Sequence, residues 1–190
     1  GSTVRVNQAN LEDAKLQVSL ADSVPEDTTE SKTTWKIGVD QLDIRRSDVT
    51  VHLPGDTLQV RAYLGKAVAS EGSFDLGEGV YRLKKLDWTD GKLNYDNKWK
   101  AHSKGLDYNH LALSGITVGI DSLQYQASKL DMNVRQIAFR EKSGLDLQHL
   151  SGNVALDSTR LRLKNAHLKT SESNLMADLD MDLNSFSEQT

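Results

Sequence analysis

The chain has 190 residues, a formal net charge of −4 and 37% hydrophobic residues, which suits one domain or a regular piece of a longer repetitive protein. Its charged residues mix both signs without an acidic or basic tail, so nucleic acid is not an expected partner. The absence of cysteine excludes disulfides, cysteine-ligated zinc and thiol catalysis. No run approaches the ~20 consecutive apolar residues that a membrane-spanning helix needs.

The N-terminal part of the chain carries the weakest structural signal. Residues 1–2 (Gly-Ser) have the form of a scar left by removal of an expression tag, so we expect residues 3–190 to be a single β-repeat segment of a larger protein. Residues 15–20 alternate apolar and polar side chains and predict a strand, whereas residues 7–16 are the best, though weak, helical candidate. Residues 21–34 are polar and acidic, which predicts a mobile loop.

From residue 35 onward, apolar and polar side chains alternate almost continuously. In residues 57–64 and 175–183 every second side chain is apolar, and Asp178, Asp180 and Asp182 fall together on the polar side. A period of two is typical of a strand with one buried and one wet face. We therefore expect an all-β protein, and we interpret the three aspartates as a solvated strand face because a calcium loop needs a glycine turn and a distal glutamate.

The alternation repeatedly skips one step at a pair of mostly polar residues. The pairs are Asp40-Gln41, Lys84-Lys85, Ser114-Gly115, Asp121-Ser122, Arg135-Gln136 and Gln148-His149. Such a shift would turn the apolar side chains of a straight strand to the solvent face. A β-bulge absorbs the extra residue, restores the face and bends the strand. Some pairs could instead be corners of tight turns between strands.

Turn signals punctuate the alternating runs at spacings suited to antiparallel neighbours. They lie at residues 54–56 (Pro-Gly-Asp), 77–79 (Gly-Glu-Gly), 90–91 (Asp-Gly) and 96–97 (Asp-Asn). Together with the bulges, they predict an elongated, curled antiparallel β-sheet, a half-pipe or β-taco with an apolar concave face.

No combination of residues in the chain indicates catalysis, a metal site or a cofactor. His52, His102, His110, His149 and His167 do not pair at metal-ligand spacing, and we interpret them as scattered surface side chains. No nucleophile elbow, P-loop or dinucleotide motif occurs. The three tryptophans at positions 35, 88 and 99 are the first aromatic residues to test for binding, although core or edge positions are expected. We therefore predict a non-enzymatic protein whose function resides in a surface.

The predicted functional surface is an apolar groove inside the curled sheet. The chain offers too few apolar residues for a second layer to cover this face, so it would suit acyl chains or an unfolded hydrophobic strand. The candidate groove residues are Leu42, Ile44, Leu58, Val60, Leu64, Leu86, Trp88, Leu111, Leu113, Ile137, Phe139, Leu145, Leu147, Leu163, Leu168, Leu175, Leu179, Met181 and Leu183.

The C-terminal third of the chain resembles the repeats of TamB-type, AsmA-like envelope proteins, which belong to the translocation and assembly module. The resemblance rests on the pattern F-x-E-x-S-G-L-x-L-x-x-L that begins at Phe139 and the pattern L-x-T-x-x-S-x-L that begins at Leu168. Residues 39–51, 81–95 and 108–125 are similar to the same repeat more loosely, so the resemblance covers roughly residues 35–183.

The resemblance implies a large periplasmic protein that is anchored in the inner membrane by an N-terminal segment. It implies a groove that serves phospholipid transport between membranes, or outer-membrane protein assembly with a barrel partner, and it supplies no catalytic residues. Its partners would be phospholipid acyl chains or hydrophobic client strands.

Two other functions remain open at the level of sequence. The chain could be a structural β-repeat of a cell-surface adhesin or passenger domain with a closed core. Closed solenoids usually show regular coil lengths, and the uneven spacing of the skips favours an open sheet instead. A carbohydrate-binding or carbohydrate-processing domain would need an aromatic cluster and paired carboxylates, neither of which can be picked out.

Overall fold

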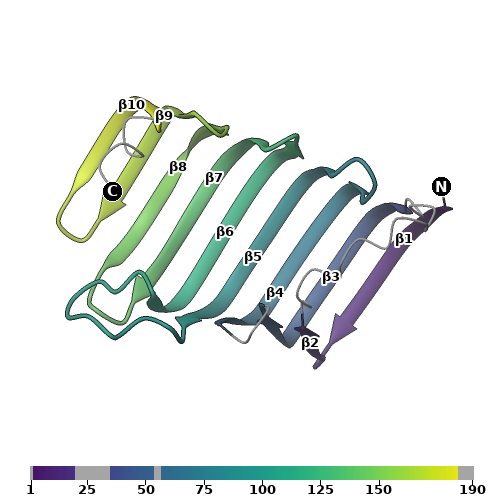
Figure 1. Ribbon diagram of the computed structural model, residues 1–190, viewed down its shortest axis with the longest axis horizontal. Helices are drawn as coiled ribbons and strands as arrows, with labels where there is room; N and C mark the ends of the chain where they lie inside the picture. The colour runs from purple at the N-terminus through teal and green to yellow at the C-terminus, as the bar shows by residue number, and fades with distance from the viewer. Residues whose placement is uncertain (1, 20–34, 54–56, 184–190) are drawn as a thin grey trace.

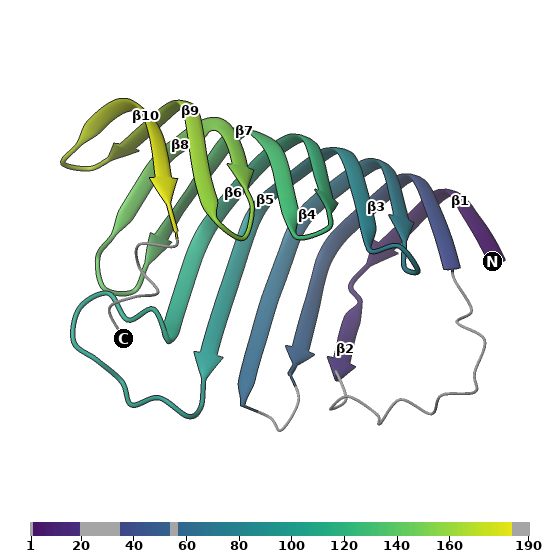
Figure 2. The ribbon, with the colours of Figure 1, turned by 45° about the horizontal axis from the view of Figure 1, so that its top comes forward.

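The computed structural model describes residues 2–19, 35–53 and 57–183, and these residues form a single curled β-sheet that does not close into a barrel (Figures 1 and 2). The strands are β1 (Ser2–Glu12), β2 (Lys15–Ser19), β3 (Trp35–His52), β4 (Leu58–Asp75), β5 (Val80–Asn97), β6 (His110–Gln126), β7 (Lys129–Glu141), β8 (Asp146–Leu156), β9 (Arg160–Thr170) and β10 (Asn174–Asp182). The all-β prediction is confirmed. Among the described residues, no helix is long and apolar enough to cross a membrane.

The strands from β3 to β10 form an antiparallel meander in which each strand pairs with the next one along the chain. β1 and β2 both pair with β3 in parallel, so the sheet is mixed and the expectation of a purely antiparallel sheet is wrong at this end. The helix considered over residues 7–16 is also wrong, because these residues lie in β1 and β2 and obtain their backbone hydrogen bonds from β3. The strand predicted over residues 15–20 is confirmed over Lys15–Ser19.

The predicted turns have mixed outcomes. Residues 77–79 lie in the turn between β4 and β5, and residues 96–97 end β5. Residues 90–91, in contrast, lie inside β5, so this Asp-Gly pair is a strand irregularity rather than a hairpin turn. The predicted loop over residues 21–34 and the predicted turn at residues 54–56 lie outside the described residues.

All six skipped pairs lie inside strands, as bulges do, and none is a corner between strands. At Arg135-Gln136 the pairing of β7 with β8 shifts between Val134 and Ile137. At Asp40-Gln41 the pairing of β3 with β4 is interrupted on both strands at once, so the same register continues beyond the interruption. The skips therefore preserve one apolar face, in some places by a shift of register and in others by matching irregularities on neighbouring strands.

The matching irregularities line up across the sheet in two rows. Row A consists of Asn7, Asp40, Glu71, Lys84 and Ser122, one residue from each of β1, β3, β4, β5 and β6. Row B consists of Asp13, Arg46, Gly65, Asp90 and Gly115, from the β1–β2 junction and the same four longer strands. Because bulges bend strands, two aligned rows bend the whole sheet together. Figure 2 shows that neighbouring strands curve together in the same direction.

Unusual backbone angles and ion pairs also mark row B. Arg46, Asp90 and Gly115 of row B have φ angles of 45°, 53° and 59°, in the left-handed region that is uncommon for residues other than glycine. The Arg46 guanidinium donates hydrogen bonds to Asp13 at 2.8 Å and to Glu12 at 2.5 Å, and it lowers the pKa of the Asp13 carboxyl. Charged side chains thus link neighbouring strands where the backbone departs from regular pleating.

Gly65 provides a direct test of row B, because a β-carbon there would lie 2.6 Å from both the β-carbon and the carbonyl oxygen of Asp90. We expect Gly65→Ala to lower the free energy of unfolding by about 1–3 kcal/mol, the usual cost of overpacking. Gly38→Ala is the matched control, since its β-carbon would come no closer than 3.9 Å to Arg5 and should change stability by no more than about 0.5 kcal/mol. Urea unfolding followed by circular dichroism measures both. Equal losses would contradict the close approach of β4 and β5 at this row.

Candidate functional site: the apolar face of the sheet

The register of the strands places apolar side chains on one common face from one edge of the sheet to the other. Residues directly opposite each other on paired strands share a face. The longest unbroken series of opposite partners is Leu11, Ile44, Ala67, Trp88, Val118, Ile137, Leu150, Leu168 and Leu175. This series, named here the central apolar row, crosses nine strands without a polar member.

Most of the sequence-predicted groove residues share the face of the central apolar row. They are Leu42, Ile44, Leu58, Val60, Leu64, Leu86, Trp88, Leu111, Leu113, Ile137, Phe139, Leu147, Leu163, Leu168, Leu175, Leu179 and Met181. Leu145 lies instead in the β7–β8 connection, and Leu183 follows the end of β10. Alternation alone could not separate these two residues from the strands beside them.

Sequence reasoning missed several residues of the same face. Ile116, Ile120 and Val134 are among its most buried members, with exposures of 3%, 9% and 4%. They stand next to Ser114-Gly115, Asp121-Ser122 and Arg135-Gln136 respectively, so the skips themselves were the signal that could have located them.

Burial on the apolar face decreases from the middle of the sheet toward its edges. Ala67 and Ile116 are buried, whereas Val18 on β2 and Leu175 on β10 are 45% and 56% exposed. Each strand makes its substantial contacts with the strands beside it in the sheet, so among the described residues no second layer packs on this face. The central side chains are therefore buried by one another, and the outer ones remain accessible.

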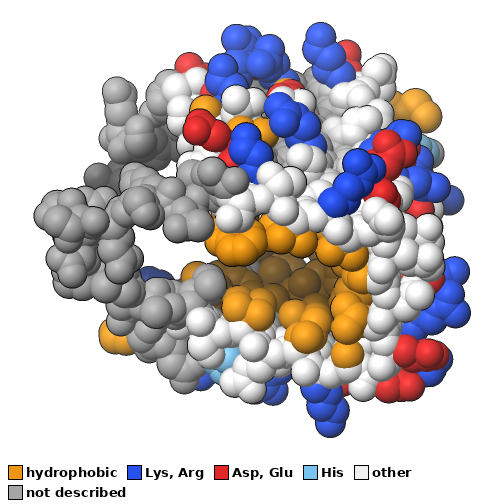
Figure 3. All heavy atoms as spheres, turned by 90° about the vertical axis from the view of Figure 1, so that its right-hand side faces the viewer, with side chains coloured by type: hydrophobic (Ala, Val, Ile, Leu, Met, Phe, Trp, Pro, Cys, Tyr) orange, Lys and Arg blue, Asp and Glu red, His pale blue; other side chains and the backbone are white. Residues whose placement is uncertain are grey.

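Figure 3 looks along the sheet from the β1 side and shows a hollow with hydrophobic side chains on its visible lining. Charged side chains gather on the outer surface around this hollow. On that polar side, Arg135 of β7 bonds to Asp87 of β5 at 2.5 Å and to Asp121 of β6 at 2.8 Å. Burial opposes ionisation of Asp87, yet the hydrogen bond from Arg135 holds the pKa of its carboxyl below the ordinary value. One guanidinium thus ties three successive strands together.

The three tryptophans occupy different environments. Trp88 is half-buried in the central apolar row and lies against Gly91, where a β-carbon would come within 2.4 Å of its indole ring. Trp35 begins β3 and is 42% exposed. Trp99 lies in the β5–β6 connection and is 75% exposed, so the expectation of a core or edge position is wrong for this residue.

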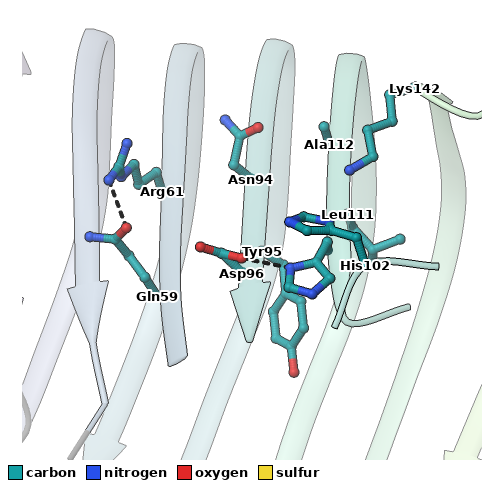
Figure 4. A pocket seen from close by; sticks show the side chains of 10 residues that line it. Gln59, Arg61, Asn94, Tyr95, Asp96, His102, Leu111, Ala112 and Lys142 are labelled. Carbon is teal, nitrogen blue, oxygen red and sulfur yellow. Dashed lines mark hydrogen bonds and ion pairs between the residues drawn. The ribbon is translucent and has the colours of Figure 1, made fainter. Parts of the chain in front are cut away.

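A polar pocket lies near one rim of the sheet, where the β5–β6 connection meets the strand ends (Figure 4). It contains Asp96 at the end of β5 and His110 at the start of β6, which are direct cross-strand partners. His110 Nδ1 lies 2.7 Å from Asp96 Oδ1, and His110 Nε2 lies 2.8 Å from the carbonyl oxygen of Lys100. The hydrogen bond to Asp96 raises the pKa of the buried His110 imidazole.

Four of the five histidines lie in two pairs, so the expectation of scattered surface side chains is wrong for these four. The rings of His102 and His110 lie 3.8 Å apart between centroids, and those of His149 and His167 lie 5.0 Å apart. The two histidines of each pair are farther apart in the sequence than the short metal-ligand spacing considered above. The β5–β6 connection joins the first pair, and adjacent strands β8 and β9 join the second.

Comparisons of this chain with protein-family models, with curated proteins and with solved structures give no match. The candidate site is therefore assessed on its geometry and chemistry alone.

The gradient of burial predicts unequal costs of truncation along the apolar face. Ile116→Ala should lower the free energy of unfolding by about 2–5 kcal/mol, because it removes a fully packed side chain and leaves a cavity. Leu175→Ala should cost less than about 1 kcal/mol, because this leucine is 56% exposed in the edge strand β10. Denaturant titration of both variants tests this difference. A loss at Leu175 as large as that at Ile116 would mean that the edge of the face is as tightly packed as its middle.

Proposed function

We propose that the apolar face of this curled sheet is a concave groove that binds the acyl chains of phospholipids. The observation that carries the proposal is the central apolar row, which continues from β1 to β10, and no second layer of described residues lies over it. An uncovered apolar surface of this length is unfavourable in water, and large exposed apolar patches usually mark binding sites. Acyl chains match it because they need apolar contact and no hydrogen-bonding partner.

In this proposal the chain is a non-enzymatic segment of a periplasmic TamB-type, AsmA-like protein that is anchored in the inner membrane. The groove serves phospholipid transport between membranes, outer-membrane protein assembly with a barrel partner, or both. The curled, unclosed sheet supports this choice over an adhesin repeat, which would need a closed core. Within the described residues, the outer strands β1 and β10 each pair on one side only, so further strands could extend the groove at either edge.

The curvature of the apolar face also favours a flexible hydrocarbon ligand over a rigid one. The face follows two bends, at row A and at row B, so a ligand that lies along a strand must follow the same curvature. An acyl chain can do so by rotation about its single bonds. A hydrophobic client strand would need its backbone hydrogen bonds satisfied, and the edges of the sheet offer such bonds more readily than its face does.

Site-specific photocrosslinking tests the proposal with a matched pair of neighbouring positions. Leu83 is half-buried on the apolar face, and Arg82 is exposed on the opposite face of the same strand. A photoreactive phenylalanine analogue placed at Leu83 should form adducts with phospholipid when the protein is purified from cells or mixed with phospholipid vesicles. The same analogue at Arg82 should form few.

Mass spectrometry of the irradiated protein identifies the adducts. A polypeptide adduct at Leu83 in place of lipid would favour hydrophobic client strands as the occupant. Absence of any adduct at Leu83, or equal lipid labelling at Arg82, would overturn the proposal of a lipid-binding groove.

A further inference from the structure

Three potential metal ligands lie on a short stretch of chain at the rim, and two of them, His102 and His110, line the polar pocket. One ligand atom each from His102, Asp107 and His110 lies within 4.8 Å of the other two. All three come from the β5–β6 connection or from the first residue of β6. The pocket lies on the polar side of the sheet, since Asp96 and His110 stand one residue away from Tyr95 and Leu111 of the apolar face. The chemistry of this cluster is therefore separate from that of the groove.

His110 is oriented as a metal-binding histidine is. Metal-ligating histidines almost always donate the N–H of their other ring nitrogen to a carboxylate or carbonyl group. Asp96 accepts such a bond from Nδ1 at 2.7 Å, which leaves Nε2 directed toward the connection. There Nε2 lies 2.8 Å from the carbonyl oxygen of Lys100, so binding of a metal ion at Nε2 would take the place of this hydrogen bond.

Asp107 is a buried carboxylate that two backbone hydrogen bonds hold in place. It is 2% exposed, its Oδ2 accepts a hydrogen bond from the Ser103 backbone N–H at 2.8 Å, and its Oδ1 accepts one from the Asn109 N–H at 3.0 Å. Each carboxylate oxygen has a further lone pair, so Oδ2 can bind a cation without losing its backbone bond.

We propose that His102, Asp107 and His110 form a binding site for a divalent transition-metal ion of the zinc class, with Asp96 as the supporting carboxylate. Two imidazoles and one carboxylate are a ligand set that suits Zn²⁺. The ion would link the β5–β6 connection to the end of β6. With three side-chain ligands, a further coordination position remains for water or for the nearby carbonyl oxygen of Lys100.

The ligand atoms of the three side chains need to move only modestly closer together to bind a zinc ion. Ligand atoms around a tetrahedral zinc lie about 3.3–3.5 Å apart, because Zn–N and Zn–O bonds are about 2.0–2.2 Å long. His102 Nδ1 lies 3.9 Å from Asp107 Oδ2, and the His102 side chain is 75% exposed, so it can rotate to close this gap.

The surrounding charges are balanced rather than uniformly favourable. Arg61 and Lys142 line the same pocket and would repel a cation. The carboxylates of Asp96 and Asp107 offset them, and Arg61 is directed to Gln59 by a hydrogen bond of 2.7 Å. A zinc ion bound by neutral imidazoles and Asp107 gains coordination bonds as well as charge attraction. A simple monovalent cation would gain no comparable coordination bonds.

Zinc titration of the untagged protein, after removal of metals with a chelator, tests the proposal. Isothermal calorimetry should show one Zn²⁺ per chain, and Zn²⁺ should slow amide hydrogen exchange in residues 98–109. His102→Ala removes an exposed ligand with little risk to folding and should weaken binding by more than about tenfold. Asp96→Asn should weaken it by about 10–100-fold, the usual cost of losing a supporting carboxylate.

His167→Ala is the matched control, because His167 also lies beside another histidine but has no carboxylate in its group. This variant should bind Zn²⁺ as the unchanged protein does. Absence of binding, binding that His102→Ala leaves unaltered, or an equal loss in His167→Ala would overturn the proposed site. The outcome does not depend on whether the groove binds lipid.

Discussion

The structure depends on one constraint: every strand must keep its apolar side chains on the same face while the sheet bends. In a regular strand these two requirements conflict, because an extra residue that bends the strand also turns its side chains over. From β1 to β5 the chain meets both by placing the extra residues of neighbouring strands opposite each other, and from β6 to β9 it does so by shifts of register. Glu71 of β4, for example, lies between Asp40 of β3 and Lys84 of β5. The central apolar row is the result.

The two faces of the sheet contribute to stability in different ways. On the apolar face, side chains in the middle of the sheet bury one another, and no second layer packs on them in the part of the chain that the structure describes. On the polar face, ion pairs such as Arg135 with Asp87 and Asp121 connect strands at positions where the pleat is irregular. Exposed ion pairs contribute little individually. Their value here is geometric, because they hold bent strands in register.

Much of the fold could be predicted from the sequence, and the reasons for success and failure are local. Alternation and skipped pairs are properties of single strands, so all-β structure and bulges were accessible. The parallel pairing of β1 and β2 with β3 was not, because no short-range pattern records which strand a segment joins. The row-B residues Arg46 and Asp90 were also missed, because no apolar residue of the polar run 45–48 marks a skip and because Asp90-Gly91 has the form of a hairpin turn.

The candidate sites also divide into one that the pattern of single strands predicts and one that it does not. The apolar face could be predicted because alternation assigns each leucine or valine to a side of its strand. The cluster of His102, Asp107 and His110 could not, because a connection without regular structure brings these residues together. The exposed position of Trp99 in that connection was missed for the same reason.

The packing of each described strand mainly on its neighbours in the sheet has a consequence for how the molecule unfolds. A protein whose strands pack only on their neighbours behaves as a linear array, in which stability is approximately a sum of strand terms and nearest-neighbour terms. The last member of the array, β10, has almost entirely exposed side chains and one neighbour. Opening therefore begins at the ends and proceeds inward. Partial denaturation shortens the array one strand at a time and leaves the middle folded.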